Sequence, residues 1–323
     1  MAKTGVLRRG IFVDINSVNV NDLDFSLLKQ QLDHLELRSV SSVDEMQADF
    51  NAYDVVITNK VKFNKQVLQA NRHIQLICVA ATGTNNIDLQ AAHELGIKIC
   101  NVTGYATPSV VQHVFALILA LQTRLLEIKQ AVSQGEWSRS EYFSLLSYPV
   151  HELAGKTMGI VGYGELGKAV AGVAQAFGMR VLIARRNPQD DRAGRLALHE
   201  LLPQVDVLSL HCPLTEETQN LIAEKEFNLM KTSAMIINTA RGGIVNETAL
   251  LSALENQQIA AAGIDVLTIE PPADNHPLLT YKNNNLIVTP HIAWASHESR
   301  QRLLNEIAFN IKAFNEGKMR NAV

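Results

Sequence analysis

Short runs of β-branched and other apolar residues alternate with segments of helical periodicity from the start of the chain to about residue 102. The runs predict strands, and the segments between them predict helices, one of which is capped by Asp88 and stops at Gly96. Strands that alternate with helices indicate a parallel sheet covered on both faces. The predicted strands are 10–15, 34–40, 53–59, 74–80 and 98–102, and the predicted helices are 24–32 and 88–96.

A long apolar segment follows and predicts one helix over 107–135. The segment is apolar on nearly all sides, so most of its surface needs burial. Gln112, His113 and Gln122 interrupt it, and it is too short to span a membrane. A domain junction or a dimer interface would bury such a helix equally well.

The alternation restarts after this helix and continues to the end of the chain. Six further strands with helices between most of them are typical of the doubly wound dinucleotide-binding sheet. The predicted strands are 157–162, 179–184, 206–211, 234–240, 259–266 and 285–290, and the predicted helices are 167–177, 247–257 and 297–316.

The length of 323 residues exceeds what one hydrophobic core usually serves, so the sequence predicts two domains. Apolar residues make up 47% of the chain and charged residues 19%, which is typical of an ordinary globular protein. The net charge is −3, the two signs are interspersed and no basic stripe is present, which argues against nucleic acid as a partner.

The opening "MAKTGVLRRG" lacks the apolar run of a signal peptide, and no stretch of 18 apolar residues occurs, so we expect no membrane association. The cysteines Cys78, Cys100 and Cys212 fit neither a disulfide framework nor a zinc spacing. Two of them fall in apolar strand-like runs, where a buried reduced thiol is expected. These features predict a soluble, cytoplasmic protein.

The stretch "GIVGYGELGKAVA" contains Gly162, Gly164 and Gly167 in G-x-G-x-x-G spacing, directly after a predicted strand and at the start of a helix. The first glycine makes the tight turn, the second lets the backbone approach a pyrophosphate, and the third lets helix pack on strand. The helix N-terminus then offers N–H groups and a positive dipole to the phosphates. The alternative is a glycine turn that binds nothing.

Arg185 and Arg186 stand where the second strand of this sheet ends, 18 residues after Gly167 in the case of Arg185. An acid at this place would bond the adenine ribose hydroxyls of NAD and repel a 2′-phosphate. Arginine instead donates a fork of N–H groups to phosphate and keeps its charge. The sequence therefore favours NADP(H), with NAD(H) still possible. The alternative is a solvated arginine pair with an acid elsewhere, for which Asp190 and Asp191 lie too far along the chain.

The chain resembles the D-isomer-specific 2-hydroxyacid dehydrogenases along essentially its whole length. Within that family it is most similar to the glycerate dehydrogenases, also called hydroxypyruvate reductases. Beyond the glycine turn, the family likeness rests on "INTARGGIVNETALLSAL" (237–254), "GIDVLTIEPP" (263–272) and "TPHIAWAS" (289–296). The narrower likeness rests on "TNKV" (58–61), "VTGYATPSVVQHVFAL" (102–117), "LHCPLT" (210–215) and "HIAWAS" (291–296).

This resemblance implies an α/β fold of two doubly wound parallel-sheet domains. A flavodoxin-like substrate domain would comprise 1–103 and 292–323, and a Rossmann dinucleotide-binding domain would comprise 104–291. The implied activity is hydride transfer from NAD(P)H to a small 2-keto acid, with hydroxypyruvate and glyoxylate expected. The chemistry would take place across a cleft whose hinges lie near 103–106 and 290–296.

The resemblance assigns catalysis to Arg241, Glu270 and His291. Reduction of a 2-keto acid leaves negative charge on the former carbonyl oxygen, and histidine is suited to donate the proton near neutral pH. Glu270, if it pairs with His291, would favour the imidazolium. The planar fork of Arg241 suits a substrate carboxylate and can polarise the carbonyl. Taken singly, a surface ion pair, a loop charge and a capping or core histidine are the alternatives.

Further positions follow from the resemblance and have structural alternatives of their own. Backbone N–H groups of Ala81, Thr82 and Gly83 would meet the substrate carboxylate, unless "AATGTNN" is only a strand-to-helix turn. Asn59 and Lys60 match a second pocket loop, but Lys60 can equally be solvated. Asp265 would lie near the nicotinamide or cap its loop. The expected cofactor contacts are Thr107, Gly162, Gly164, Glu165, Leu166, Gly167, Arg185, Arg186, Cys212, Pro213, Thr218, Thr239, Ala240, Arg241, Asp265, His291 and Ala293.

Two other kinds of protein share this pattern. Transcriptional co-repressors similar to this family are dinucleotide-sensing binding modules, and another D-2-hydroxyacid dehydrogenase is the alternative among enzymes. Formate dehydrogenases have glutamine where Glu270 stands, so Glu270 favours keto-acid chemistry. His276, His291 and His297 form no recognisable metal spacing, so no metal is expected.

The remaining expected partner is a second copy of the chain. The apolar helix and the loop after it predict a homodimer through 107–150. Trp137 resembles a residue that in some relatives reaches the partner's pocket. Because a lone loop tryptophan more often packs, it is not counted as catalytic.

Overall fold

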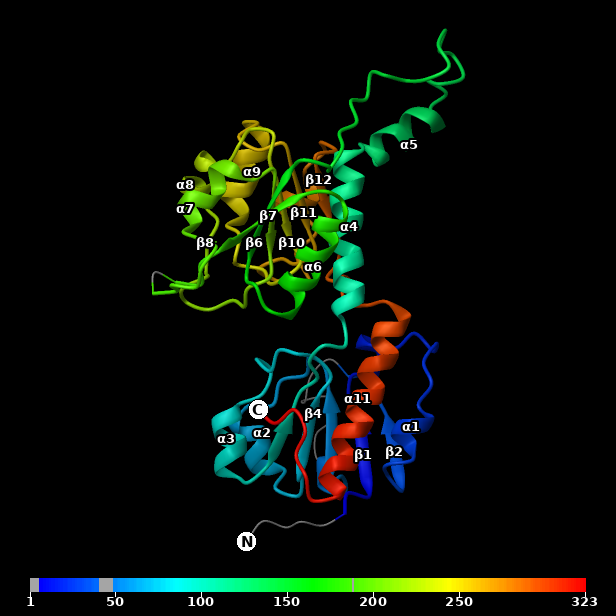
Figure 1. Cartoon of the computed structure of the whole chain (residues 1–323). Coiled ribbons are helices and arrows are strands. Elements are labelled where there is room, and N and C mark those ends of the chain that lie inside the picture. Colours follow the sequence, from blue (N-terminus) through cyan, green and yellow to red (C-terminus); the bar gives the residue numbers. More distant parts are fainter. Residues whose placement is uncertain (1–5, 41–48, 188) are drawn as a thin grey trace. The chain divides into compact units, whose positions relative to one another are not determined.

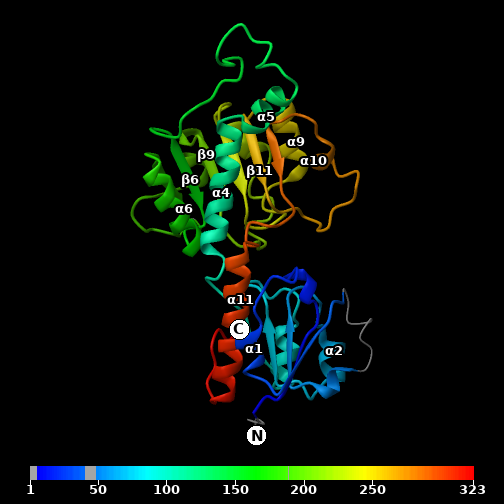
Figure 2. The same cartoon turned by 90° about the vertical axis from the view of Figure 1, so that its right-hand side faces the viewer.

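The computed structural model describes the chain apart from residues 1–5, 41–48 and 188 (Figures 1 and 2). The chain forms two compact units. Unit 1 comprises Met1–Ala106 and Trp294–Val323, and unit 2 comprises Thr107–Ala293. These bounds lie two or three residues after the expected domain boundaries.

Unit 1 is built on a five-stranded sheet in the order β2-β1-β3-β4-β5, and all of its strand pairs are parallel. This strand order is the flavodoxin-like one, which confirms the predicted fold of this half. Its strands are β1 (Arg9–Phe12), β2 (His34–Leu37), β3 (Val55–Thr58), β4 (Leu76–Val79) and β5 (Lys98–Cys100). Its helices are η1 (Ile15–Ser17), α1 (Ser26–Lys29), η3 (Asp49–Ala52), α2 (Lys65–Ala70), α3 (Leu89–Glu94) and α11 (His297–Asn315).

Helices cover both faces of this sheet, as Figure 2 shows for α11 and α1 on one side and α2 on the other. On the first face Ile57 of β3 packs in one cluster with Leu303 and Ile307 of α11. On the other face the neighbouring Val56 packs in a cluster with Leu68 of α2. Because successive side chains of a strand point to opposite faces, both strands are fully buried; β4 is apolar at every position and β3 at every position except Thr58. Cys78 and Cys100 are buried free thiols on β4 and β5, as predicted.

Unit 2 is built on a seven-stranded parallel sheet in the order β12-β11-β10-β9-β6-β7-β8. The order reverses between β6 and β9, as in the doubly wound dinucleotide sheet. Its strands are β6 (Thr157–Val161), β7 (Arg180–Ala184), β8 (Arg195–Leu196), β9 (Val207–Leu210), β10 (Met235–Asn238), β11 (Ala261–Ile264) and β12 (Leu286–Val288). Its helices are α4 (Thr107–Gln122), α5 (Leu125–Ser133), α6 (Glu165–Ala176), α7 (Leu198–Leu201), η4 (Leu202–Gln204), α8 (Glu224–Leu229), α9 (Glu247–Glu255) and α10 (Pro277–Thr280).

The prediction of six strands in this half is one short. The additional strand, β8, consists of the two residues Arg195 and Leu196, which pair with the end of β7. A strand of two residues is too short to show an alternating pattern, so only the sheet itself reveals it.

The two faces of the unit 2 sheet are covered by different helices (Figure 1). Leu208 of β9 and Ile236 of β10 pack with Phe227 of α8 and Leu250 of α9 on one face. On the other face α4 lies against β11, where a Cβ on Gly263 would stand 3.1 Å from the Cβ of Leu117. The glycine in "AAGI" therefore allows the close approach of α4 to the sheet.

The expected single helix over 107–135 is wrong, because the segment forms two helices. α4 ends at Gln122, α5 begins at Leu125, and the two are bent by 58°. Arg124 between them has a left-handed φ of 52°, which ends the first helix without a glycine or proline. No single helix in the described part of the chain is long and apolar enough to cross a membrane; α4 and α5 reach that length only as a bent pair.

Candidate active site

The glycine turn lies between β6 and α6 in unit 2. Gly162 has a φ of +93°, and a Cβ there would stand 2.5 Å from the backbone nitrogen of Cys212. A Cβ on Gly167 would stand 2.1 Å from the carbonyl oxygen of Gly162. Around the Cβ position of Gly164, by contrast, no atom lies within 4 Å. Two glycines thus close the turn, and the third leaves it open to a pyrophosphate at the N-terminus of α6.

Two buried polar atoms at the same edge of the sheet have no hydrogen-bond partner within the described part of the chain. They are His211 Nδ1, directly after β9, and Thr239 Oγ1, directly after β10. Burial lowers the pKa of His211 to about 4, so its imidazole is neutral at working pH. Buried polar atoms normally have partners, and orphaned ones at a ligand-binding edge suit groups that a ligand brings. With the open glycine turn, they show that the residues present fit a dinucleotide.

Other expected cofactor contacts come together in pairs. Thr107 Oγ1 at the start of α4 donates to Glu165 Oε1 at the start of α6, at 2.5 Å. Thr218 Oγ1 donates to the carbonyl oxygen of Pro213 at 2.7 Å in the loop after β9. Both pairs belong to loops or helix starts at the carboxyl edge of the sheet, where ligands of such sheets bind.

The arginine pair after β7 lies in a loop held by Asp190. One carboxylate oxygen of Asp190 accepts the backbone N–H of Arg186 at 2.9 Å, and Arg192 binds both oxygens at 2.6 and 2.7 Å. Arg195 Nη1 lies 3.4 Å from the same carboxylate, and its guanidinium stands over the ring of Tyr163 in the glycine turn. The hydrogen bonds from Arg192 and from the Arg186 backbone hold the pKa of Asp190 well below its usual range.

This arrangement decides what Asp190 can do. Its side chain is 5% exposed and its oxygens are already occupied by arginine and backbone donors, so it offers no acceptor to ribose hydroxyls. Arg185 donates only its Nε–H, to the carbonyl oxygen of Arg195 at 3.2 Å. Within the described residues the terminal amino groups of Arg185 and Arg186 have no protein acceptor, and both side chains are exposed. The loop therefore presents cations, not an acid.

The three residues expected to be catalytic all lie in loops after strands of unit 2. His291 Nδ1 and Glu270 Oε2 are 2.6 Å apart, with about a third of each side chain exposed. The other oxygen of Glu270 accepts the backbone N–H of Leu267 at 2.9 Å, which fixes the carboxylate in its loop. Arg241 follows β10, and its Nη1 donates to the carbonyl oxygen of Ala240 at 2.7 Å. The structure thus brings Glu270 and His291 together and places Arg241 at the same edge.

Asp265 lies at the end of β11 and caps the loop that carries His291. Its side chain is 0% exposed and accepts the backbone N–H groups of Ile292 at 3.0 Å and Ala293 at 2.9 Å. Its carbonyl oxygen accepts the N–H of His291 at 2.8 Å. Asp265 therefore caps this loop with a buried carboxylate, and its expected position near the nicotinamide stays a prediction.

The expected substrate-binding residues lie at the carboxyl ends of β3 and β4 in unit 1. Asn59 is buried, and its N–H and that of Lys60 both donate to the carboxylate of Asp14, at 2.9 and 2.6 Å. Thr82 Oγ1 donates to the carbonyl oxygen of Val102 at 2.9 Å. Within the described residues the backbone N–H groups of Thr82 and Gly83 have no protein acceptor, so they can donate to a bound anion.

Asp14 and Asp190 are the residues that the sequence gives least reason to single out. Asp14 lies near the end of an apolar strand-like run and Asp190 in a polar loop, and no motif surrounds either residue. The carboxylate of Asp14 binds the backbone N–H groups of Asn59 and Lys60, and that of Asp190 binds the backbone N–H of Arg186. A carboxylate placed a few residues after a strand, near a turn, is the only signal that could have marked them.

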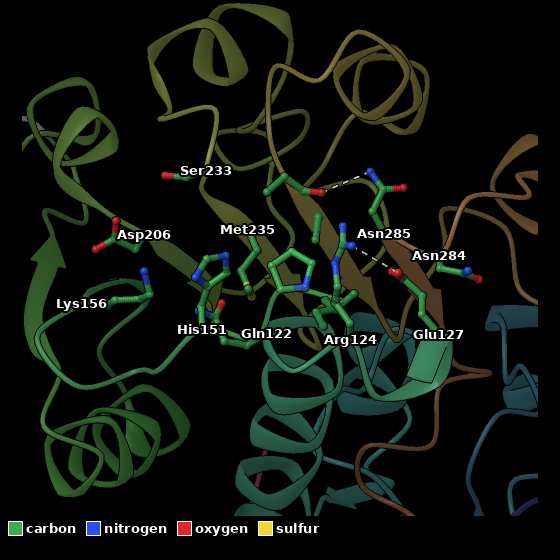
Figure 3. A pocket seen from close by; sticks show the side chains of 14 residues that line it. Gln122, Arg124, Glu127, His151, Lys156, Asp206, Ser233, Met235, Asn284 and Asn285 are labelled. Carbon is green, nitrogen blue, oxygen red and sulfur yellow. Dashed lines mark hydrogen bonds and ion pairs between the residues drawn. The ribbon is translucent and has the colours of Figure 1, made fainter. Parts of the chain in front are cut away.

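A cavity of about 250 Å³ lies elsewhere in unit 2, lined by Gln122, Arg124, His151 and Lys156 among others (Figure 3). Lys156 precedes β6 and Met235 begins β10, so this cavity is at the amino edge of the sheet. Ligands of open α/β sheets bind at the opposite, carboxyl edge. We therefore do not count the cavity as part of the active site. No group of three or more metal-ligating side chains occurs among the residues that were placed.

Comparisons with known proteins agree with this reading of unit 2. Residues 115–293 match the family model described as D-isomer specific 2-hydroxyacid dehydrogenase, NAD binding domain. The chain is 39% identical over 316 residues to a glycerate dehydrogenase of Methylorubrum extorquens, which spans 98% of this chain and 99% of the relative. It is 36% identical over 319 residues to a hydroxypyruvate reductase of Blautia hydrogenotrophica, spanning 97% and 98%.

A solved structure with a similar fold carries bound ligands. It is an NADPH-dependent glyoxylate/hydroxypyruvate reductase of Sinorhizobium meliloti in complex with NADP and malonate. The TM-score is 0.80 at 26% identity, and the match covers 98% of this chain and 96% of that one.

Proposed function

The chain belongs to the D-isomer specific 2-hydroxyacid dehydrogenase family, and on that premise we propose that it is an NADPH-dependent reductase of hydroxypyruvate and glyoxylate. The observation that carries the proposal is the 2.6 Å contact between His291 and Glu270 at the carboxyl edge of a dinucleotide-type sheet. The substrate class is supported by relatives named glycerate dehydrogenase, hydroxypyruvate reductase and glyoxylate reductase.

The proton needed for reduction comes from His291. Because its Nδ1 is held by Glu270, the ring delivers the proton through Nε2 to the oxygen that becomes the hydroxyl. The carboxylate of Glu270 stabilises the charged imidazolium before transfer and keeps the ring in one orientation. When bound, the reduced nicotinamide supplies the hydride.

In this proposal Arg241 binds the carboxylate of the keto acid. Arg241 donates one N–H to the carbonyl oxygen of Ala240. This hydrogen bond fixes the side chain and leaves further donors of the guanidinium for the substrate. The N–H groups of Thr82 and Gly83 stay predicted donors to the substrate. Asn59 and Lys60 stay predicted pocket residues, with Asp14 holding their backbone.

The dinucleotide would be held by the glycine turn, by the first N–H groups of α6, and by Thr239. The proposed preference for NADPH rests on the cations of Arg185 and Arg186 and on the occupied carboxylate of Asp190. A 2′-phosphate would meet arginine donors there, whereas the ribose hydroxyls of NADH would meet no acidic acceptor from these residues.

Initial-rate measurements with the purified chain test this proposal. We expect NADPH oxidation that depends on added hydroxypyruvate or glyoxylate, and D-glycerate as the only enantiomer formed from hydroxypyruvate. A chain that binds NADPH but turns over no 2-keto acid would contradict the proposal and favour a dinucleotide-sensing module.

We also propose that two copies pair through the 107–150 region. Figure 1 shows α5 and the segment after it extending away from the sheet of unit 2. Large apolar side chains of this segment are exposed, with Phe143 at 93% and Leu146 at 88%. Exposed apolar surface of this kind marks an interaction site, and a second copy is the partner always present.

Sedimentation equilibrium tests the pairing. We expect twice the chain mass of 35.6 kDa for the native protein, and a shift to the single-chain mass when Phe143 and Leu146 are both replaced with Ser. A native protein that sediments at the single-chain mass at micromolar concentration contradicts the pairing.

A further inference from the structure

We propose that His113 is a positioning residue for His291 and acts through Thr289 and Asp265. The inference rests on the proposed role of His291 as the proton donor. His113 stands in the middle of α4, far along the chain from the 289–293 loop, and belongs to none of the residue sets assigned above. Its side chain is 18% exposed, so it is largely enclosed by unit 2.

A chain of short contacts joins His113 to the loop of His291. His113 Nε2 lies 3.0 Å from Thr289 Oγ1, and Thr289 Oγ1 lies 2.5 Å from Asp265 Oδ1. His113 Nε2 is also 3.5 Å from that same carboxylate oxygen. Asp265 in turn accepts the backbone N–H groups of Ile292 and Ala293, the two residues directly after His291.

The protons available on these three side chains fix the direction of each hydrogen bond. An ionised carboxylate only accepts, so the single hydroxyl proton of Thr289 goes to Asp265. The oxygen of Thr289 can then only accept from His113, which requires a proton on His113 Nε2. This holds for the neutral ring with its proton on Nε2 and for the imidazolium alike. His113 therefore donates into the network and orients the hydroxyl of Thr289 towards the carboxylate.

The loop needs this support because its backbone is strained at His291. The φ of His291 is +53°, in the left-handed region that non-glycine residues adopt only at an energetic cost. Such a conformation persists only where surrounding contacts over-determine it. Here the contacts are the backbone bonds from His291 to Asp265 and Thr289 and the carboxylate of Asp265 on the next two N–H groups.

Asp265 can hold the loop only while its buried charge is compensated. Its side chain has no exposure, and an ionised carboxylate in that setting needs donors for its lone pairs. Thr289 supplies one donor, and His113 orients Thr289 and adds a partial positive charge at 3.5 Å. Without His113 the hydroxyl of Thr289 can turn away, and the loop and the His291 ring lose their single orientation.

His113→Leu and His113→Gln separate this role from simple packing. Leu fills similar space without a donor, whereas Gln carries an N–H group the same number of bonds from the backbone as His Nε2. We expect His113→Leu to lower kcat for hydroxypyruvate reduction about tenfold, with the Kd for NADPH and the unfolding midpoint changed little. His113→Gln should keep kcat within about twofold of the native value.

Thr289→Val removes the next hydrogen-bonding group of the same network and provides a second variant. It should lower kcat to a similar extent. The double variant His113→Leu/Thr289→Val should have a kcat no lower than that of the less active single variant, because the effects of residues in one network are not additive. Native kcat in His113→Leu overturns the inference, and so does a His113→Gln variant as slow as His113→Leu.

Failure of the inference is distinguishable from failure of the proposed function. If His291→Asn abolishes turnover while His113→Leu leaves it intact, only the role of His113 is lost. If the native chain turns over no 2-keto acid, the proposed function fails first.

Discussion

Replacing His291 with Asn is expected to lower kcat for hydroxypyruvate reduction about a thousandfold. A positioned general acid contributes roughly 10²–10⁴ to a rate, and His291 is held against Glu270 at 2.6 Å for that task. Asn can still donate a hydrogen bond but cannot transfer a proton. The Kd for NADPH should stay within about twofold, because the glycine turn and the arginine loop are untouched.

His199→Asn is the matched control, since His199 is an exposed histidine on α7 of the same unit. It should behave as the native chain. Glu270→Gln is expected to fall between the two, because Gln can still accept from Nδ1 but brings no negative charge to stabilise the imidazolium. If His291→Asn retains more than a tenth of native kcat, another group supplies the proton and the mechanism is wrong.

Replacing Arg185 with Asp is expected to change the ratio of kcat/KM for NADPH over NADH by about a thousandfold, in favour of NADH. The substitution removes charge-assisted donors from the 2′-phosphate, worth about 1.5–3 kcal/mol, and adds a like-charge contact that costs a further few kcal/mol. Each 1.4 kcal/mol is a factor of ten. The new carboxylate also supplies the acceptor that ribose hydroxyls of NADH need.

Arg72→Asp changes the net charge equally at an exposed site of unit 1 and should leave the ratio unchanged. The effect at Arg185 should shrink as salt is added, because the contact between the guanidinium and the phosphate is near the surface. An unchanged ratio in Arg185→Asp would show that Arg185 is a solvated charge and that the proposed cofactor preference is wrong.

Much of the fold follows from local pattern. The strands of both sheets are short apolar runs between helical segments, and the parallel order follows from that alternation. The break between α4 and α5 does not follow, because Arg124 adopts a positive φ with no glycine or proline beside it to mark the site. β8 is equally hidden, since its two residues are recognisable only by their pairing with β7.

In the site, too, some residues are found from a sequence motif and others only from their contacts in the structure. The spacing of the glycines predicts the glycine turn, and the resemblance identifies Glu270 and His291 without knowledge of their contact. The role of Asp190 cannot be predicted in this way, because it depends on the hydrogen bond from the Arg186 backbone to its carboxylate. In the sequence His113 is only a polar residue that interrupts an apolar helix, and its contact with Thr289 is visible only in the structure.

The most direct test of the central claim is the ratio of kcat/KM for NADPH over NADH in hydroxypyruvate reduction by the native chain. The occupied carboxylate of Asp190 and the two exposed arginines predict measurable turnover with a ratio of at least about ten, since even one charge-assisted bond to the 2′-phosphate is worth about 1.5 kcal/mol. Turnover with a ratio below one would keep the reductase and contradict the cofactor assignment. No turnover with either dinucleotide would contradict the function itself.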